Sequence, residues 1–204
     1  MKQEFYVENR QKLAMRLKDG DIMLFFSGES VRKTADENFP FFTNRNFLYL
    51  TGVKQEQSAL ILQNKGGYVS ERLFALKPDI ELEKWTGKRF TEQELNEFSG
   101  IEQIEDITNL NKTLEALLTS PQVHTLWLCL DFFTPLRSFD IEREFAKGIR
   151  NRHPHILIKN SYPLVCAMRK IKTPDEIDAI RKGMQITEAG IRRMMHVAKP
   201  GMKE

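Results

Sequence analysis

The stretch SALILQNKGGYVSERLFAL (58–76) decides the fold, because it contains two apolar segments joined by turn residues. SALILQ (58–63) and GYVSERLFAL (67–76) have the composition of β-strands, and Asn64-Lys65-Gly66 lies between them. The pattern predicts a β-hairpin. A phosphate-binding loop at Lys65-Gly66-Gly67 is the alternative, but such loops need a longer glycine-rich motif than this one.

The residues before this hairpin predict one helix and one buried strand. A helix is expected over 2–18, with Tyr6 and Leu13 on its apolar face and Gly20 ending it. IMLFF (22–26) is a short continuous apolar run that is typical of a buried strand. FLYLTG (47–52) is a second apolar run and ends in a turn.

After the hairpin, predicted strands alternate with predicted helices. Thr91 and Glu94 form a capping box for one of these helices. The expected helices cover 79–84, 91–98, 109–119 and 138–150, and the expected strands cover 101–104, 123–130 and 155–160. A strand meander followed by alternating helices and strands predicts an α/β fold, with a mixed β-sheet and helices on both faces. The element order resembles a ribonuclease H-like layout.

The last segment predicts an amphipathic helix of roughly six turns. Thr173, Pro174 and Glu176 form a strong helix start, and Pro200-Gly201 stops the helix. An apolar stripe follows the start at helical spacing: Ile177, Ile180, Met184, Ile191 and Met195. Two interpretations stay open, because this helix either packs on the preceding domain or belongs to a following one. We favour the second and divide the chain into residues 1–172 and 173–204.

Composition excludes several classes of protein. The net charge of +3 is too small to imply a nucleic acid or an acidic membrane surface as partner, and no run of 18 apolar residues predicts a membrane span. Cys129 and Cys166 lie in apolar contexts, so we expect two buried thiols and no disulfide framework. Cysteines without a disulfide framework favour a reducing compartment, and the N-terminus has no apolar signal core. We therefore expect a cytoplasmic location.

No catalytic or metal-ligating set is evident in the sequence. The four histidines (His124, His153, His155 and His196) form no HxxxH or HExxH pair, so we assign no metal ligand and no catalytic residue. A nuclease of the ribonuclease H-like kind would need an acid inside its first strand, but Asp21 precedes the strand as a turn residue would, and Asp131 stands alone. Ser27 lacks a GxSxG frame, and Cys166 has no basic partner nearby in sequence.

Several motifs in order resemble one family. VRKTADENFPFFTNRNFLYLTG (31–52) is followed by EKWTGKR (83–89), MRKIKTPDEI (168–177) and PGMKE (200–204), and Arg10 precedes them all. Together they resemble the N-terminal domain of aminopeptidase P, in the creatinase/prolidase "pita-bread" family of metallopeptidases. The resemblance implies that residues 1–172 form a non-catalytic accessory domain that restricts substrate access and makes subunit contacts. Residues 173–204 would be the first helix and turn of the catalytic domain.

The resemblance also implies an activity for the parent protein. Members of the family remove an N-terminal residue that precedes proline, and a hydroxide bridging two metal ions, usually manganese, attacks the scissile carbonyl. The ligands of that site would lie beyond Glu204, so we expect the present chain alone to be inactive. The expected partners are a peptide with proline in second position and further copies of the protein. The alternatives are a non-catalytic peptide- or protein-binding module and a prolidase-type dipeptidase.

Trp85 and Arg89 are the candidate substrate-binding residues, and both assignments come from the resemblance. In aminopeptidase P this loop lies near the active site of another subunit. Trp85 would cover part of the substrate pocket, and Arg89 would pair with a carboxylate of the peptide or of a neighbouring subunit, a role that Lys88 could serve equally. The alternative is a packed tryptophan beside solvated cations, in a loop between helices.

Two other segments receive the plainer interpretation. The aromatic residues from Phe39 to Tyr49 are expected to form a core-and-turn segment, whose asparagines bond local backbone, rather than the mouth of a peptide site. Arg169 is expected to pair structurally near the domain junction.

Overall fold

A computed structural model describes residues 1–131 and 141–203 of the chain. The chain separates into two compact units, Lys2–Met168 and Arg169–Glu204, with Met1 grouped with the second. The two units are described separately below. No helix among the described residues is long and apolar enough to cross a membrane.

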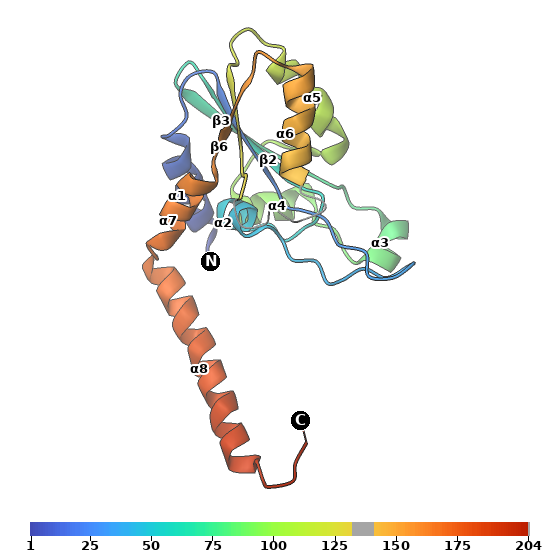
Figure 1. Cartoon of the computed structure of the whole chain (residues 1–204), viewed down its shortest axis with the longest axis vertical. Helices are drawn as coiled ribbons and strands as arrows, with labels where there is room; N and C mark the ends of the chain where they lie inside the picture. Colours follow the sequence, from blue (N-terminus) through green and yellow to red (C-terminus); the bar gives the residue numbers. More distant parts are fainter. Residues whose placement is uncertain (132–140, 204) are drawn as a thin grey trace. The chain divides into compact units, whose positions relative to one another are not determined.

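The first unit is built on a six-stranded sheet with the order β4-β3-β2-β1-β5-β6. Figure 1 labels β2, β3 and β6 of this sheet. Its strands are β1 (Asp21–Phe26), β2 (Ala59–Lys65), β3 (Tyr68–Ala75), β4 (Ile104–Asp106), β5 (Thr125–Leu128) and β6 (Leu157–Asn160). The strand β2 runs antiparallel to both β1 and β3, whereas β1 and β5, β5 and β6, and β3 and β4 are parallel pairs. The expected mixed sheet and ribonuclease H-like layout are confirmed.

The hairpin predicted from 58–76 is also confirmed. Lys65 lies opposite Tyr68, so Gly66 and Gly67 are the two turn residues, one position later than the sequence suggested. Their φ angles are 62° and 83°, and two consecutive positive values are what a type I′ hairpin turn requires. The turn therefore accounts for both glycines without a phosphate.

The sheet has a hydrophobic core on each face. All six residues of β1 are buried, and because strand side chains alternate, Met23 and Phe25 enter one core while Ile22, Leu24 and Phe26 enter the other. Helices α1 (Gln3–Ala14), α2 (Arg45–Thr51), α4 (Glu92–Ser99) and α7 (Tyr162–Lys170) contribute to the first core. Helices α5 (Leu110–Leu118) and α6 (Ile141–Arg152) contribute to the second. Helices on both faces of the sheet are thus confirmed.

Helix α2 explains why the run 47–52 has no partner in the sheet. Asn44 caps the helix by accepting hydrogen bonds from the backbone N–H groups of Asn46 and Phe47, and Gly52 ends it with a φ of 72°. A Cβ atom on Gly52 would lie 2.5 Å from the ring of Tyr6, so both the backbone angle and the contact with α1 require glycine here.

Other boundaries differ from the expected ones. Helix α1 ends at Ala14 rather than at residue 18. Two successive turns follow, in which the N–H groups of Arg16 and Leu17 donate to the carbonyls of Leu13 and Ala14. Leu17 is still buried. The strand expected at 101–104 begins at Ile104, because Ile101 is buried next to the end of α4. Helices α2 and α7 were not predicted from the sequence, and the start of the helix expected from 138 lies outside the described residues.

A buried ion pair connects α1 to the sheet. Arg10 is fully buried, and its Nε atom lies 2.8 Å from Oε2 of Glu71 on β3, while its Nη1 donates to the carbonyl of Leu50 at 2.8 Å. Burial lowers the pKa of Arg10, and the charge of Glu71 opposes that shift. One side chain thereby holds α1, α2 and β3 together.

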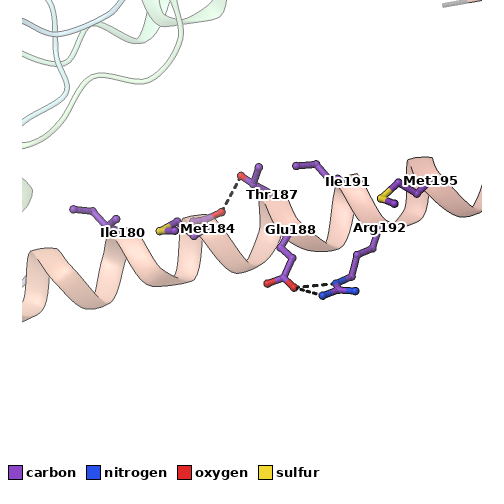
Figure 2. A pocket seen from close by; sticks show the side chains of 8 residues that line it. Ile180, Met184, Thr187, Glu188, Ile191, Arg192 and Met195 are labelled. Carbon is purple, nitrogen blue, oxygen red and sulfur yellow. Dashed lines mark hydrogen bonds and ion pairs between the residues drawn. The ribbon is translucent and has the colours of Figure 1, made fainter.

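The second unit consists mainly of α8 (Pro174–Val197), a helix of 24 residues. The Thr173 hydroxyl accepts from the N–H of Glu176, and the Glu176 carboxylate accepts from the N–H of Thr173, so the predicted capping box is confirmed. No residue of α8 is buried. Figure 2 shows the ion pair of Glu188 with Arg192 on this helix.

Candidate functional site

The predicted substrate-binding residues lie on and just after α3 (Ile80–Thr86). Asp79 caps this helix by accepting from the N–H groups of Glu81 and Leu82. Trp85 belongs to the last turn of α3 and not to a loop between helices, which corrects the sequence-based expectation. Its side chain is 89% exposed, so the alternative of a packed tryptophan does not match the structure.

Trp85 is one of several exposed apolar residues of α3. The helix has no buried residue, and Ile80 and Leu82 are 78% and 47% exposed. Apolar residues that remain exposed together are candidates for contact with a ligand or another chain.

Arg89 is half-buried and held by backbone contacts. Its Nη1 donates to the carbonyl of Lys77 at 3.1 Å, and its own N–H donates to Oε1 of Glu83 at 3.2 Å. Within the described parts of the chain, no carboxylate forms an ion pair with its guanidinium. Arg89 thus retains unused donors that could bind a carboxylate from another molecule.

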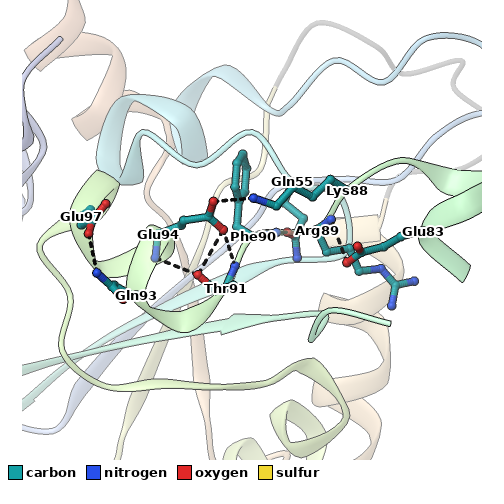
Figure 3. A network of polar contacts seen from close by, with 9 residues as sticks. All are labelled: Gln55, Glu83, Lys88, Arg89, Phe90, Thr91, Gln93, Glu94 and Glu97. Carbon is teal, nitrogen blue, oxygen red and sulfur yellow. Dashed lines mark hydrogen bonds and ion pairs between the residues drawn. The ribbon is translucent and has the colours of Figure 1, made fainter. Parts of the chain in front are cut away.

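Lys88 is used differently from Arg89 (Figure 3). Its Nζ lies 2.7 Å from Oε1 of Glu94, the same carboxylate that completes the capping box of α4 with Thr91. Because Glu94 accepts from Lys88 and from the N–H of Thr91, its pKa is lowered to about 2. The same contact raises the pKa of Lys88. The sequence left Lys88 and Arg89 interchangeable, and the structure separates their roles.

The side chain of Gln55 holds both ends of the segment that contains α3. The side chain of Gln55 is buried, donates to the carbonyl of Leu76 at 2.9 Å and accepts from the N–H of Phe90 at 2.8 Å. The backbone is therefore held at both ends of the segment that contains α3. Figure 3 shows Gln55 beside Phe90 at the second of these ends. Sequence patterns did not indicate Gln55, because its partners are backbone groups far away in the chain.

The metal site implied by the family resemblance does not fit the residues present. Among residues 1–131 and 141–203, no group of three or more His, Cys, Asp and Glu side chains is placed to hold an ion. Near the C-terminal end of α6, Glu115 lies 2.9 Å from His153 and 3.1 Å from Arg152, and His155 bonds the carbonyl of Leu118. These contacts link α5 and α6, and they provide only one carboxylate.

Asp21 also has a structural role. It is the first residue of β1 rather than a turn residue before it, which corrects the sequence-based assignment. Its buried carboxylate accepts from the N–H of Lys18 at 3.1 Å and from the indole N–H of Trp127 at 3.1 Å. A carboxylate held by two donors in the core gives no support to a nuclease.

The two cysteines differ in environment. Cys129 is buried as expected, but Cys166 is half-buried, so the expectation of two buried thiols is wrong for it. Burial raises the pKa of Cys129 to about 12, although a hydrogen bond from Asn46 works in the other direction. A thiol with so high a pKa is a poor nucleophile. No disulfide joins the two residues.

The aromatic segment 39–49 is divided between core and surface. Phe47 is fully buried and Asn44 bonds local backbone, which confirms the core-and-turn interpretation for this half. Phe39 and Phe42 are 51% and 74% exposed, and the guanidinium of Arg45 lies 5.9 Å from the ring of Phe42. Arg169 lies near the end of α7, beside the boundary between the two units.

One pocket had no signal in the sequence. It lies at the carboxyl end of β1 and includes Phe26, Gln57, Leu110 and Ile141 among its lining residues. Gln57 has a φ of 50°, the one positive value for a residue other than glycine within the described ranges. The pocket combines an apolar floor with a few polar groups and holds no catalytic set.

Comparison with known proteins gives a consistent result. The sequence profile of the aminopeptidase P N-terminal domain matches residues 6–127. The Xaa-Pro aminopeptidase of Escherichia coli is 27% identical over 206 residues, which are 100% of this chain and 46% of that protein. The Xaa-Pro aminopeptidase of Haemophilus influenzae is 28% identical, with 98% and 44% covered. The chain spans about half the length of the curated relatives it matches.

Solved structures agree with these sequence matches. A candidate aminopeptidase P from Bacillus anthracis superposes with a TM-score of 0.90 at 34% identity, covering 94% of this chain and 46% of that one. Aminopeptidase P from Escherichia coli with the inhibitor Pro-Leu gives a TM-score of 0.84 at 22% identity, covering 99% and 46%. At that identity the second likeness shows the fold alone.

Proposed function

This chain belongs to the aminopeptidase P N-terminal domain family, and we propose that it is the non-catalytic accessory domain of a Xaa-Pro aminopeptidase. The observation that carries the proposal is the extent of the match. Xaa-Pro aminopeptidases match essentially the whole chain, but the chain covers less than half of each of them. The whole protein would remove an N-terminal residue that precedes proline. Residues 1–172 are assigned to the accessory domain and 173–204 to the start of the catalytic domain.

The proposed reaction depends on residues other than those described here. No set of ligands for a metal exists within residues 1–131 and 141–203, so we derive no catalytic step from this chain. Manganese is our proposal for the metal of the whole enzyme. One solved form of the Escherichia coli relative is zinc-substituted and in complex with product.

Within the whole enzyme, we assign the α3 surface to substrate access. The exposed indole of Trp85 offers an apolar plane on which a proline ring or an apolar side chain could pack. Arg89 has donors left for a carboxylate of the peptide or of a neighbouring subunit. The hydrogen bonds of the Gln55 side chain with the backbone of Leu76 and Phe90 hold both ends of the α3 segment, which supports a role that needs defined positions. A homo-oligomer is part of this proposal, as is a cytoplasmic location, which the two free thiols favour.

The first test is an assay of the 204-residue chain with a Xaa-Pro peptide and manganese. We expect no turnover above the rate without protein, with the Escherichia coli Xaa-Pro aminopeptidase as the positive control. Turnover that copurifies with the chain would refute the assignment of a non-catalytic domain.

The second test addresses Trp85 and Arg89 in the complete enzyme. Trp85→Ala and Arg89→Ala should each lower kcat/KM for a Xaa-Pro tripeptide by about tenfold, because each removes one substrate contact. Lys88→Ala is the matched control and should leave kcat/KM within about twofold, since Lys88 is already paired with Glu94. Equal effects of all three substitutions would remove the proposed roles.

A binding module without catalysis is the second candidate. The exposed apolar residues of α3 favour it, since such a surface also suits a protein partner. The sequence that follows in the whole protein separates the two candidates. An ordered series of Asp, Asp, His, Glu and Glu ligands would favour the peptidase, and its replacement would favour the binding module. A prolidase-type dipeptidase has less support, because the curated relatives in the comparison are Xaa-Pro aminopeptidases.

A further inference from the structure

We propose that Gln55 is a positioning residue for substrate recognition. Its side chain is buried and acts through the backbone, where two hydrogen bonds set how the segment 77–89 presents Trp85 and Arg89. The inference rests on the proposed function, since it takes Trp85 and Arg89 as the residues that contact the substrate.

The side chain of Gln55 closes the base of this segment. Its Nε2 donates to the carbonyl of Leu76 at 2.9 Å, and its Oε1 accepts from the N–H of Phe90 at 2.8 Å. Leu76 and Phe90 are the residues immediately before and after 77–89. One planar amide group therefore sets the separation of the two ends of the segment.

The turn that carries Gln55 is itself fixed to the sheet. The N–H of Gln57 donates to the carbonyl of Gly28 at 3.0 Å. The N–H of Ser27 donates to the carbonyl of Ser58 at 2.8 Å, and the N–H of Ser58 donates to the hydroxyl of Ser27 at 2.9 Å. Ser27 directly follows β1 and Ser58 directly precedes β2, so the sheet defines the position of Gln55.

Two ion pairs also link the segment to α4, but both are exposed. Nζ of Lys77 lies 3.3 Å from Oε1 of Glu92, and Nζ of Lys88 lies 2.7 Å from Oε1 of Glu94. Exposed ion pairs contribute little to holding a structure in place. Helix α3 has no buried residue, and a cavity of about 50 Å³ borders the base of the segment, so apolar packing there is incomplete. The placement of the segment therefore depends on the buried amide of Gln55.

The same base determines where Arg89 lies (Figure 3). Nη1 of Arg89 donates to the carbonyl of Lys77 at 3.1 Å, and the N–H of Arg89 donates to Oε1 of Glu83 at 3.2 Å. Lys77 and Arg89 adjoin the two residues that Gln55 joins, so a change in the separation of the ends displaces the guanidinium. Because Glu83 belongs to α3, the displacement also reaches the last turn of that helix, which carries Trp85.

The residue after Gln55 offers a matched control. Oε2 of Glu56 accepts from the N–H of Ser30 at 3.0 Å and from its hydroxyl at 2.6 Å. Consecutive side chains of one turn thus hold two different segments. A substitution at Glu56 alters the same turn and leaves the hydrogen-bonding groups of Gln55 in place.

The first test measures amide hydrogen exchange by NMR in the 204-residue chain. Gln55→Met keeps the length of the side chain without its hydrogen bonds, and should speed exchange of the Phe90 amide at least about tenfold, while the amides of β2 keep their rates. Gln55→Glu retains an acceptor and should leave the Phe90 amide within about threefold of its original rate. Glu56→Ala should speed exchange at Ser30 and not at Phe90. A Phe90 amide that stays protected in Gln55→Met overturns the proposal.

Thermal unfolding followed by circular dichroism checks that each variant is folded. If Gln55→Met does not fold, Gln55→Asn replaces it, because its amide is one methylene too short to reach both ends of the segment. The expected exchange rates and the contradicting outcome are the same for this variant.

The second test is a double-mutant cycle in the complete enzyme. Gln55→Met should lower kcat/KM for a Xaa-Pro tripeptide by about tenfold, because it displaces the groups that contact the substrate. In a background that carries both Trp85→Ala and Arg89→Ala, the same substitution should lower kcat/KM by less than about twofold, since those contacts are already absent. Equal losses in the two backgrounds would show that Gln55 only stabilises the fold, which overturns the positioning role.

The kinetic results also separate this inference from the proposed function. If Trp85→Ala and Arg89→Ala leave kcat/KM unchanged, the substrate role of α3 fails, and the positioning role fails with it. If those two substitutions lower kcat/KM and Gln55→Met does not, only the positioning role fails.

Discussion

The sheet unit and helix α8 show the same local signals with different results in packing. Both contain a helix that begins with a Thr and Glu capping box, at Thr91 in α4 and at Thr173 in α8. In the sheet unit, Leu95 of α4 is buried in a core shared with the sheet. In the other unit, no residue of α8 is buried. Local signals therefore determine that a helix forms, and burial depends on which partners are present.

The two units consequently differ in what a single substitution can change. A side chain in the sheet unit contacts residues from distant parts of the chain, so its loss affects the whole unit. A side chain on α8 has contacts within its own helix. The following predictions measure this difference, from the largest effect to the smallest.

Core truncation should separate the two units most clearly. Phe74 is fully buried on β3, and Phe74→Ala should lower the free energy of unfolding by about 4 kcal/mol through lost burial and the cavity left behind. Ile191→Ala on α8 should change it by less than about 0.5 kcal/mol in a dilute sample. Urea denaturation followed by circular dichroism measures both. Similar losses for the two variants would show that α8 is part of the cooperative unit.

The two arginine ion pairs should differ nearly as much. Arg10→Ala leaves Glu71 without its buried partner and should cost about 3 kcal/mol. Arg192→Ala breaks the exposed pair with Glu188 and should cost at most about 0.5 kcal/mol. The same denaturation experiment gives both values. A small effect of Arg10→Ala would mean that the contacts of α1 with α2 and β3 do not depend on this ion pair.

The capping boxes of α4 and α8 consist of the same two residue types, Thr and Glu, so they can be compared directly. Thr91→Ala should lower the unfolding free energy of the sheet unit by about 1 kcal/mol, because α4 is packed into the core. Thr173→Ala should reduce helical content without moving the denaturation midpoint of the sheet unit. Far-ultraviolet circular dichroism measures the helical content, and tryptophan fluorescence measures the denaturation midpoint of the sheet unit. A midpoint shifted equally by both would contradict the separation into two units.

The smallest effect is expected from acid titration of Glu94. Its pKa in the folded chain is about 2, below the usual 4.5, so its ionised form favours the folded state. This contribution is complete above pH 4.5 and is lost as the pH falls through about 2. Carbon NMR titration of the Glu94 carboxylate measures the pKa, and Lys88→Ala should raise it, since Lys88 is the main cause of the shift. An unchanged value in that variant would assign the effect to Thr91 instead.

The sequence predicted those features that depend on neighbouring residues. The hairpin, the capping boxes of α4 and α8 and the alternation of strands with helices all follow from patterns within a few residues. The family resemblance added the identity of the fold. Helix α2 could not be predicted in this way, because its apolar residues also suit a strand and its course depends on the contact of Gly52 with Tyr6.

The candidate site was predictable only in outline. The motif 83–89 located Trp85 and Arg89, but the pattern did not show that Trp85 is exposed at the end of a helix. The division of roles between Arg89 and Lys88 depends on Lys77 and Glu94, which sequence spacing alone does not bring together. Gln55 and the pocket beside Gln57 depend on contacts between segments far apart in the chain.

The position of β1 in the sheet has a consequence for biosynthesis. This strand pairs on one side with the nearby β2 and on the other with β5, which is made much later. At translation rates of about 5–20 residues per second, the roughly 50 residues from Ala75 to Leu128 require roughly 3 to 10 s. During that interval the nascent meander presents an apolar strand with unsatisfied backbone groups along one edge. Chaperones that recognise extended apolar segments therefore have a defined time window in which to bind this polypeptide on the ribosome.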